Sequence, residues 1–155
     1  MNRGFTIIEM LVTLAILAVL ATVAAPLVQV VAQRNREDEL RRALWSIRDA
    51  IDAYKAAGDA GKFDRPLGVS GYPPKLDTLV DGVTDKTSPT HSQIYFLRRI
   101  PRDPTCDCPS RSDSQTWGKR SYASAPDSPS EGDDVYDVYS LSEGTGLNGI
   151  PYRKW

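Results

Sequence analysis

One acidic residue, Glu9, lies near the start of a long apolar run that reaches Ala32, and no other charge occurs between Met10 and Ala32. A carboxylate in apolar surroundings is costly unless a positive partner neutralises it. An acid inside a membrane segment is therefore a functional residue by default, and its partner has to be named. Glu9 is the first candidate for a specific role.

Two cysteines, Cys106 and Cys108, and one histidine, His91, are the other residues whose types could do chemistry. A zinc site would need further nitrogen or sulfur ligands, so the pair indicates either a local disulfide or two free thiols. His91 lies in a polar stretch without a nucleophile or paired acid, and we expect a solvated loop residue there.

The remaining acids do not form a recognisable catalytic set. Glu131, Asp133 and Asp134 lie in a stretch rich in Pro, Ser and Gly, where solvated turn residues are expected. No G-x-S-x-G motif is present. The sequence therefore predicts that the protein is not an enzyme.

The apolar run is long enough to cross a membrane, because about twenty helical residues span a hydrocarbon core roughly 30 Å thick. It does not read as a cleaved signal peptide, since its apolar part is too long and contains no Ala-x-Ala. An uncleaved signal anchor would fit the length but would not explain Glu9.

The segment Gly4-Phe5-Thr6-Ile7-Ile8-Glu9 follows a short basic leader and resembles the cleavage and methylation motif of type IV pilins and type II secretion pseudopilins. The resemblance implies that a prepilin peptidase cleaves between Gly4 and Phe5 and that the new amine of Phe5 is methylated. In a fibre, this positive amine of one subunit would neutralise Glu9 of its neighbour.

Helical periodicity continues beyond the apolar run. One apolar stripe has spacings of four, three, four and three residues: Leu40, Leu44, Ile47, Ile51 and Tyr54. A single helix from about Phe5 to about Ala57, ending at Gly58 or Gly61, would be roughly 80 Å long. We expect a kink or local melting at Pro26, a position that the resemblance also links to fibre assembly.

Charged residues begin the second half of this helix. Glu37 with Arg41 and Asp38 with Arg42 have the i,i+4 spacing of surface ion pairs. The positive-inside rule, applied to the arginines on this side, would place the C-terminal part in the cytoplasm. The leader motif implies the opposite orientation, and we follow the leader motif.

The sequence of the C-terminal half predicts a short helix, loops and short strands. Residues 72–80 read as a helix opened by proline, residues 81–93 as an exposed polar loop, and the apolar start of 94–104 as core. Residues 119–123 and 135–140 are the strand candidates. The predicted fold is α+β and pilin-like: a long helix, half apolar and half amphipathic, packed on a small antiparallel sheet.

A second resemblance narrows the class. The segment FLRRIPRDP at 96–104, together with GYPPKLDTLV upstream, is similar to a segment of the major pseudopilin of type II secretion systems. This chain departs from that pattern by inserting TCDCPSRSDSQT before Trp117 and Gly118. In the resembling proteins the last loop often binds calcium, which would place Asp137, Ser140 and Glu143 as ligands here.

Calcium needs about six to eight oxygen ligands, and no acid follows Glu143. We therefore expect no cofactor, with calcium as the alternative. Without a metal, hydrogen bonds and packing of Asn148, Tyr152 and Trp155 would fix the loop.

The predicted organisation is a leader at 1–4, a transmembrane and fibre-core helix at 5–32, and a periplasmic globular domain at 33–155. The resemblance implies a subunit of a type II secretion pseudopilus that self-assembles into a helical fibre and drives protein export. Its implied partners are the prepilin peptidase, minor pseudopilins, the assembly platform and the inner membrane, which it spans once. A net charge of −1 argues against nucleic acid. The alternative is a type IV pilus subunit, major or minor.

Overall fold

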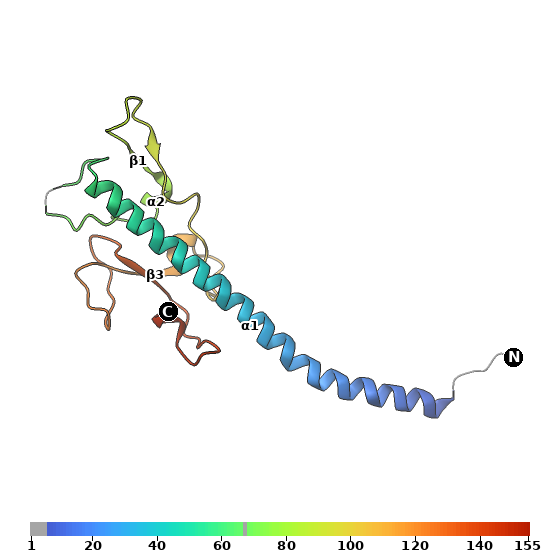
Figure 1. Cartoon of the computed structure of the whole chain (residues 1–155). Coiled ribbons are helices and arrows are strands. Elements are labelled where there is room, and N and C mark those ends of the chain that lie inside the picture. The colour runs from blue at the N-terminus through green and yellow to red at the C-terminus, as the bar shows by residue number, and fades with distance from the viewer. Residues whose placement is uncertain (1–5, 67) are drawn as a thin grey trace. The chain divides into compact units, whose positions relative to one another are not determined.

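The structure is a computed structural model that describes residues 6–66 and 68–155, without the side chains of residues 23–26. Its contacts divide the chain into two compact units, Met1–Arg36 and Glu37–Trp155. One helix, α1, runs over Ile7–Asp59 and contributes to both units (Figure 1). The predicted continuous helix is therefore confirmed.

The N-terminal unit consists of the apolar part of α1. Its large apolar side chains are exposed over the described positions between Ile7 and Val31, with Ile7 83% and Leu27 65% exposed. α1 remains helical through position 26, so the predicted local melting at Pro26 does not occur, while a bend there stays a prediction. This part of α1 is long and apolar enough to cross a membrane.

The C-terminal unit is built on the amphipathic part of α1. The predicted stripe is buried in full, from Leu40 to Tyr54. α1 ends as the sequence predicts, because Gly61 adopts the left-handed conformation with φ 72°. The amide of Gly61 donates to Gly58 and that of Lys62 to Ala57, the pair of bonds that closes a Schellman C-cap.

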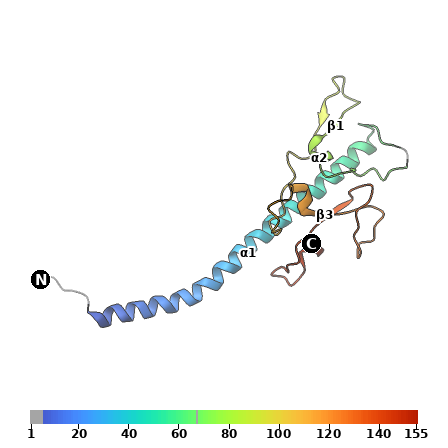
Figure 2. The ribbon, with the colours of Figure 1, turned by 180° about the vertical axis from the view of Figure 1, so that it is seen from behind.

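A small antiparallel sheet packs against this part of α1. Strand β3, Trp117–Arg120, pairs with β4, Asp137–Ser140, in the register Trp117 to Ser140 and Arg120 to Asp137. Both views place β3 beside the C-terminal half of α1 (Figures 1 and 2). Trp117 and Val138 are buried in the same core as the α1 stripe. This confirms the predicted α+β arrangement.

The predicted strand limits were wrong by about two residues. β3 begins at Trp117, because its indole donates to Pro101 at 2.7 Å and its side chain fills the core. β3 ends before Ser121, whose amide bonds to Ser130 across the following connection. β4 begins later than predicted because the amide of Val135 bonds outside the sheet, to Pro73.

The segment between α1 and β3 differs more from the sequence prediction. The predicted helix at 72–80 is reduced to α2, Thr78–Asp81, and the prolines precede it in turns. A second hairpin, β1 Val83–Thr84 with β2 Gln93–Ile94, interrupts the expected loop. The apolar start of 94–104 is only partly buried, and Tyr95 is exposed.

Two short 3-10 helices complete the described chain. The first, η1, covers Asp113–Thr116 and leads into β3. The second, η2, covers Tyr152–Lys154 near the C-terminus and contacts β4. η2 brings the aromatic residues of the tail against the core, where Tyr152 is buried.

Candidate functional site

The first described residues form a capping box at the start of α1. The backbone amide of Thr6 donates to the Glu9 carboxylate at 3.4 Å, and the Thr6 hydroxyl accepts from the Glu9 amide at 3.3 Å. These reciprocal bonds satisfy two donors that a helix N-terminus leaves unpaired. Within one subunit, Glu9 is thus held toward the end of its own helix. Gly4 and Phe5 lie outside the described residues.

Within residues 6–66 and 68–155, no other part of the chain covers the surface around Glu9. Ile8, Val12 and their neighbours on α1 are exposed, as are the apolar residues on the other faces of this segment. A helix that is apolar on all sides requires lipid or other protein around it. One acid thus lies at the head of an exposed apolar surface, of the kind that lipid or other protein buries.

The C-terminal tail is fixed to α1 by Glu37. This carboxylate is 3% exposed and accepts from the Leu147 amide at 2.8 Å and from the Tyr152 hydroxyl at 3.1 Å. Glu37 is therefore not the surface residue that its i,i+4 spacing suggests, because the folded tail covers it. Asp38 pairs with Arg41 at 3.1 Å rather than with Arg42.

A second helix residue, Arg48, holds the sheet and the chain end together. Its guanidinium donates to the Asp137 carboxylate at 2.8 Å, to the Val138 carbonyl at 3.2 Å and to the backbone oxygen of Trp155 at 2.9 Å. The Arg41 guanidinium lies 4.4 Å from the centre of the Trp155 ring. Two arginines of α1 therefore position the last residue of the chain.

The tail also stabilises itself, as the sequence predicts. The Asn148 side chain accepts from the amide of Ile150 at 3.0 Å, and the Trp155 indole donates to the carbonyl of Ile150 at 3.2 Å. The rings of Tyr152 and Trp155 meet edge to face at 5.2 Å. The prediction of a loop fixed by its aromatic residues is confirmed.

The three calcium candidates have separate surroundings. Asp137 is bound to Arg48 and also faces Arg120 at 3.6 Å. Ser140 is buried and donates to Asp103, whereas Glu143 is exposed. Among the residues that the structure describes, no group of three His, Cys, Asp or Glu side chains could hold a metal ion. Asp137 and Ser140 therefore already have protein partners, and the absence of calcium from the tail stays a prediction.

Asp103 is the centre of a buried polar network. The carboxylate is 1% exposed and accepts from the Thr105 amide at 2.7 Å, the Thr105 hydroxyl at 2.6 Å and the Ser140 hydroxyl at 2.6 Å. Its own amide donates to the Thr116 hydroxyl at 3.2 Å. Asp103 thereby joins both ends of the inserted segment to β4.

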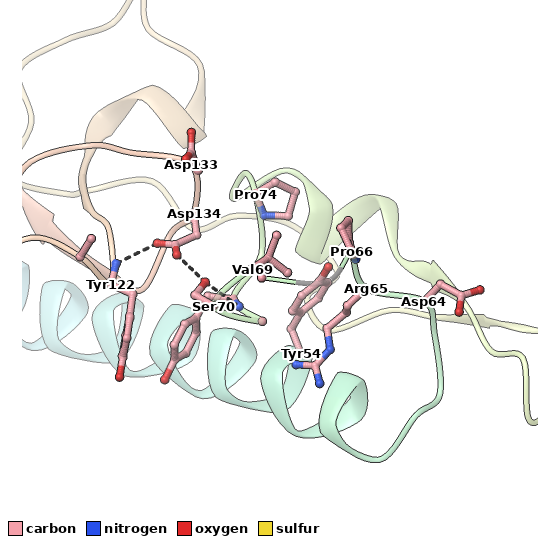
Figure 3. Close-up of a pocket in the computed structure, with 14 residues that line it drawn as sticks. Tyr54, Asp64, Arg65, Pro66, Val69, Ser70, Pro74, Tyr122, Asp133 and Asp134 are labelled. Carbon is pink, nitrogen blue, oxygen red and sulfur yellow. Dashed lines mark hydrogen bonds between the residues drawn. The ribbon is translucent and has the colours of Figure 1, made fainter.

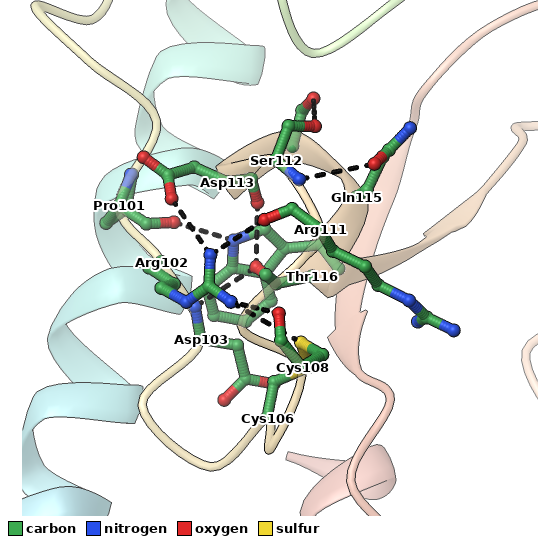
Figure 4. Close-up of polar contacts among 12 residues, drawn as sticks. Pro101, Arg102, Asp103, Cys106, Cys108, Arg111, Ser112, Asp113, Gln115 and Thr116 are labelled. Atoms are coloured by element: carbon green, nitrogen blue, oxygen red, sulfur yellow. Dashed lines mark hydrogen bonds and ion pairs between the residues drawn. A yellow bond between two sulfur atoms is a disulfide. The ribbon is translucent and has the colours of Figure 1, made fainter.

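The inserted segment is closed in two further ways (Figure 4). The structure pairs Cys106 with Cys108 in a disulfide, one of the two alternatives that the sequence leaves open. The Arg102 guanidinium donates to the carbonyls of Cys108 and Arg111, the latter at 2.9 Å, and lies 3.4 Å from Asp113. These contacts hold the inserted segment against the FLRRIPRDP segment at 96–104.

Comparisons with known proteins find similarity both at the N-terminal segment and along the whole chain. Residues 1–25 match the family model described as the prokaryotic N-terminal methylation motif. Type II secretion system core protein G of Klebsiella pneumoniae is 27% identical over 154 residues, which cover 97% of this chain and 88% of that protein. Motif and similarity together support a G-type pseudopilin. The core protein G of Klebsiella michiganensis is 26% identical over 109 residues, 66% of this chain and 68% of that protein. No solved structure matches significantly.

The sequence did not predict the contacts of several acidic residues in this pseudopilin-like chain. From the sequence, Glu37 is assigned to a helix-surface pair, Asp103 has no separate role, and Asp134 is expected to be a solvated turn residue. Asp134 instead accepts hydrogen bonds from the Ser70 hydroxyl and, at 2.8 Å, from the Tyr122 amide. Apart from the bonds of Asp103 to nearby Thr105, their partners lie 12 or more positions away in the sequence, where local spacing does not reveal them. His91 is exposed, as predicted, with a positive φ of 48°.

Proposed function

We propose that this chain is a structural subunit of the periplasmic pseudopilus of a type II secretion system. It assembles through its N-terminal helix, and the growing fibre drives protein export. The observation that carries the proposal is Glu9 at the head of an exposed, mainly apolar helix segment without further charge, inside a matched methylation motif. The work of such a subunit is mechanical, and no catalytic step is assigned to it.

From this segment we infer the order of the steps from membrane insertion to assembly. Before assembly the apolar helix spans the inner membrane once, with the C-terminal unit in the periplasm. The prepilin peptidase removes residues 1–4, and Phe5 is methylated. The assembly platform and minor pseudopilins then receive the subunit into a helical fibre, where neighbouring subunits replace lipid around the helix.

The role of Glu9 in this scheme is to set the position of each subunit. Its Thr6 bonds are 3.3 Å to 3.5 Å long, at the weak end for hydrogen bonds. A positive amine from the adjacent subunit offers a stronger, charge-assisted partner in an apolar environment. Subunits therefore fit together in the register that brings this amine to Glu9.

The sharpest test compares Glu9→Gln with Glu39→Gln, a matched change at an exposed acid of the same helix. We expect Glu9→Gln to be inserted and cleaved normally but to form few fibres by electron microscopy, while Glu39→Gln assembles like the parent. Mass spectrometry of assembled protein should give methylated Phe5 as the first residue. Normal fibre yield from Glu9→Gln would refute the pairing role of Glu9.

The alternative of a type IV pilus subunit is separated by deleting the gene. Loss of exoprotein secretion with intact twitching and DNA uptake supports the pseudopilus. The reverse phenotype would support the pilus. The disulfide encloses a single residue, whereas a large disulfide-closed C-terminal loop is the feature that many pilins share.

A further inference from the structure

A pocket of about 560 Å³ opens between two connections of the C-terminal unit (Figure 3). One wall is the connection from α1 toward α2, and the other is the connection between β3 and β4. Tyr54 of α1 forms part of the base. A volume of roughly 300 to 1,000 Å³ is typical of sites that enclose a small organic group. The proposed function of the N-terminal helix does not use this pocket.

Two carboxylates on one side of the pocket lack a compensating cation. Asp134 is held by the Ser70 hydroxyl and the Tyr122 amide, which are both neutral donors. Asp133 is exposed, and no hydrogen bond or ion pair joins it to another residue in the described ranges. The negative charge on this wall is therefore not neutralised by the fold.

The charged groups on the opposite side are paired but keep one positive charge in excess, because Lys55 and Arg65 share Asp59. Arg65 lies 2.8 Å from Asp59, which also binds Lys55. Asp64 is paired with Lys86 outside the pocket. The two carboxylates outweigh this one excess cation, so the Asp133 and Asp134 side stays negative and favours a cation as the occupant.

The rest of the lining is aromatic and apolar. The rings of Tyr72 and Tyr122 are stacked with centres 5.7 Å apart, and Tyr122 is 62% exposed. Pro66, Val69 and Pro74 add apolar surface. In Figure 3, Tyr54 and Tyr122 lie near α1, while Asp133 and Asp134 lie on the side away from it. The occupant must therefore be apolar along its length and positive at one end.

We propose that this pocket binds an arginine side chain presented by a protein partner. The aliphatic stem packs on the tyrosine and proline surfaces, and the guanidinium reaches the Asp133 and Asp134 carboxylates. A guanidinium matches this site better than an ammonium, because it is planar, weakly hydrated and donates to two oxygen atoms at once. Tyrosine supplies such contact surface at a low cost in conformational entropy.

The test uses the full chain in detergent micelles with ¹³C-labelled tyrosine rings. N-acetyl-arginine amide is titrated in, and its citrulline analogue, which has nearly the same shape but no charge, serves as the matched ligand. We expect saturable shifts of the Tyr72 and Tyr122 signals with arginine only. These signals are assigned with Tyr72→Phe and Tyr122→Phe.

Two variants then test whether the arginine side chain binds at Asp133. Asp133→Asn should weaken arginine binding about threefold, as expected for a partly exposed ion pair. Asp127→Asn changes an exposed acid of the same connection that does not line the pocket, and it should leave binding unchanged. Equal shifts with citrulline, no saturation with arginine, or equal effects of the two variants would each overturn the proposal.

Discussion

The hydroxyl of Tyr152 donates to the carboxylate of Glu37 at 3.1 Å, across 115 positions of the chain. Leu147, in the same tail, donates its amide to the same carboxylate oxygen at 2.8 Å. Glu37 of α1 thus binds two separate positions of the C-terminal loop. The loop is held to α1 by direct bonds, and this contact defines where the C-terminal unit begins on the helix.

Replacing Glu37 by alanine should destabilise the C-terminal unit. The change leaves the Tyr152 hydroxyl and the Leu147 amide without this acceptor, and an unsatisfied buried polar group costs about 1 to 3 kcal/mol. We expect a lower midpoint in chemical denaturation of the full chain in detergent. Faster exchange of the Leu147 amide should accompany it.

The matched control for this prediction is Glu39→Ala, two positions along the same helix and exposed. It removes the same charge without removing a buried acceptor, so the midpoint should change little. Equal losses in the two variants would mean that the effect comes from charge or helix propensity rather than from the tail.

Asp103→Asn should destabilise the unit by about 2 kcal/mol, because an amide cannot accept at both ends and places a donor against existing donors. The carboxylate accepts from Thr105 on one oxygen and from Ser140 on the other. Asp107→Asn, in the exposed part of the same segment, is the control. The measurement is the free energy of unfolding of each variant. If Asp103→Asn lowers it no more than Asp107→Asn does, the stabilising role of the Asp103 network is contradicted.

The sequence predicts those features that depend on local spacing. The apolar stripe of α1, its glycine stop and the β4 strand follow from periodicity and from the conformations that particular residues allow. The leader motif indicates Glu9 in the same way. Each of these is readable within a few residues of the chain.

Other features depend on contacts between distant residues, and local patterns do not contain them. Glu37 is buried by a tail over a hundred positions away, and Asp103 by Ser140, 37 positions away. The β1–β2 hairpin has two residues per strand, too few to show an alternating pattern. An acid of this kind cannot be told from a solvated one until its partners are placed.

Asp59 should titrate below its ordinary pKa of 3.8. Hydrogen bonds from Lys55 and Arg65 lower the pKa of this exposed carboxyl. A lowered folded-state pKa means that the contribution to stability is present above the unfolded pKa and is lost as the pH falls through the folded value. Lys55→Ala should return the pKa toward 3.8. NMR pH titration of the carboxyl carbon measures both values, and an unchanged pKa would contradict the assigned cause.

Calcium should not change the stability of the C-terminal unit. Asp137 is already bound by Arg48, and Ser140 by Asp103, so ligands for an ion are not gathered at the tail. We expect the same thermal midpoint with added calcium and with a chelator. A midpoint that rises with calcium would show that the tail rearranges to bind it, and Glu143→Gln would then remove the rise.

Arg102→Ala should loosen the inserted segment more than loss of the disulfide does. Arg102 holds the segment at three places, the Cys108 and Arg111 carbonyls and the Asp113 carboxylate, whereas the disulfide closes only the short Cys106–Cys108 loop. Loop-closure entropy for so small a ring is worth about 1.5 kcal/mol. Amide exchange over residues 105–116 should therefore increase more in Arg102→Ala than in the Cys106→Ser, Cys108→Ser variant.

The control for Arg102 is Arg98→Ala, which removes an exposed arginine from the same FLRRIPRDP segment. Its exchange rates over 105–116 should match the parent. The unreduced protein should weigh less than the reduced protein by the mass of two hydrogen atoms, which establishes the disulfide before the variants are compared. If the cysteine variant loosens the segment and Arg102→Ala does not, the covalent bond rather than the guanidinium holds the insertion in place.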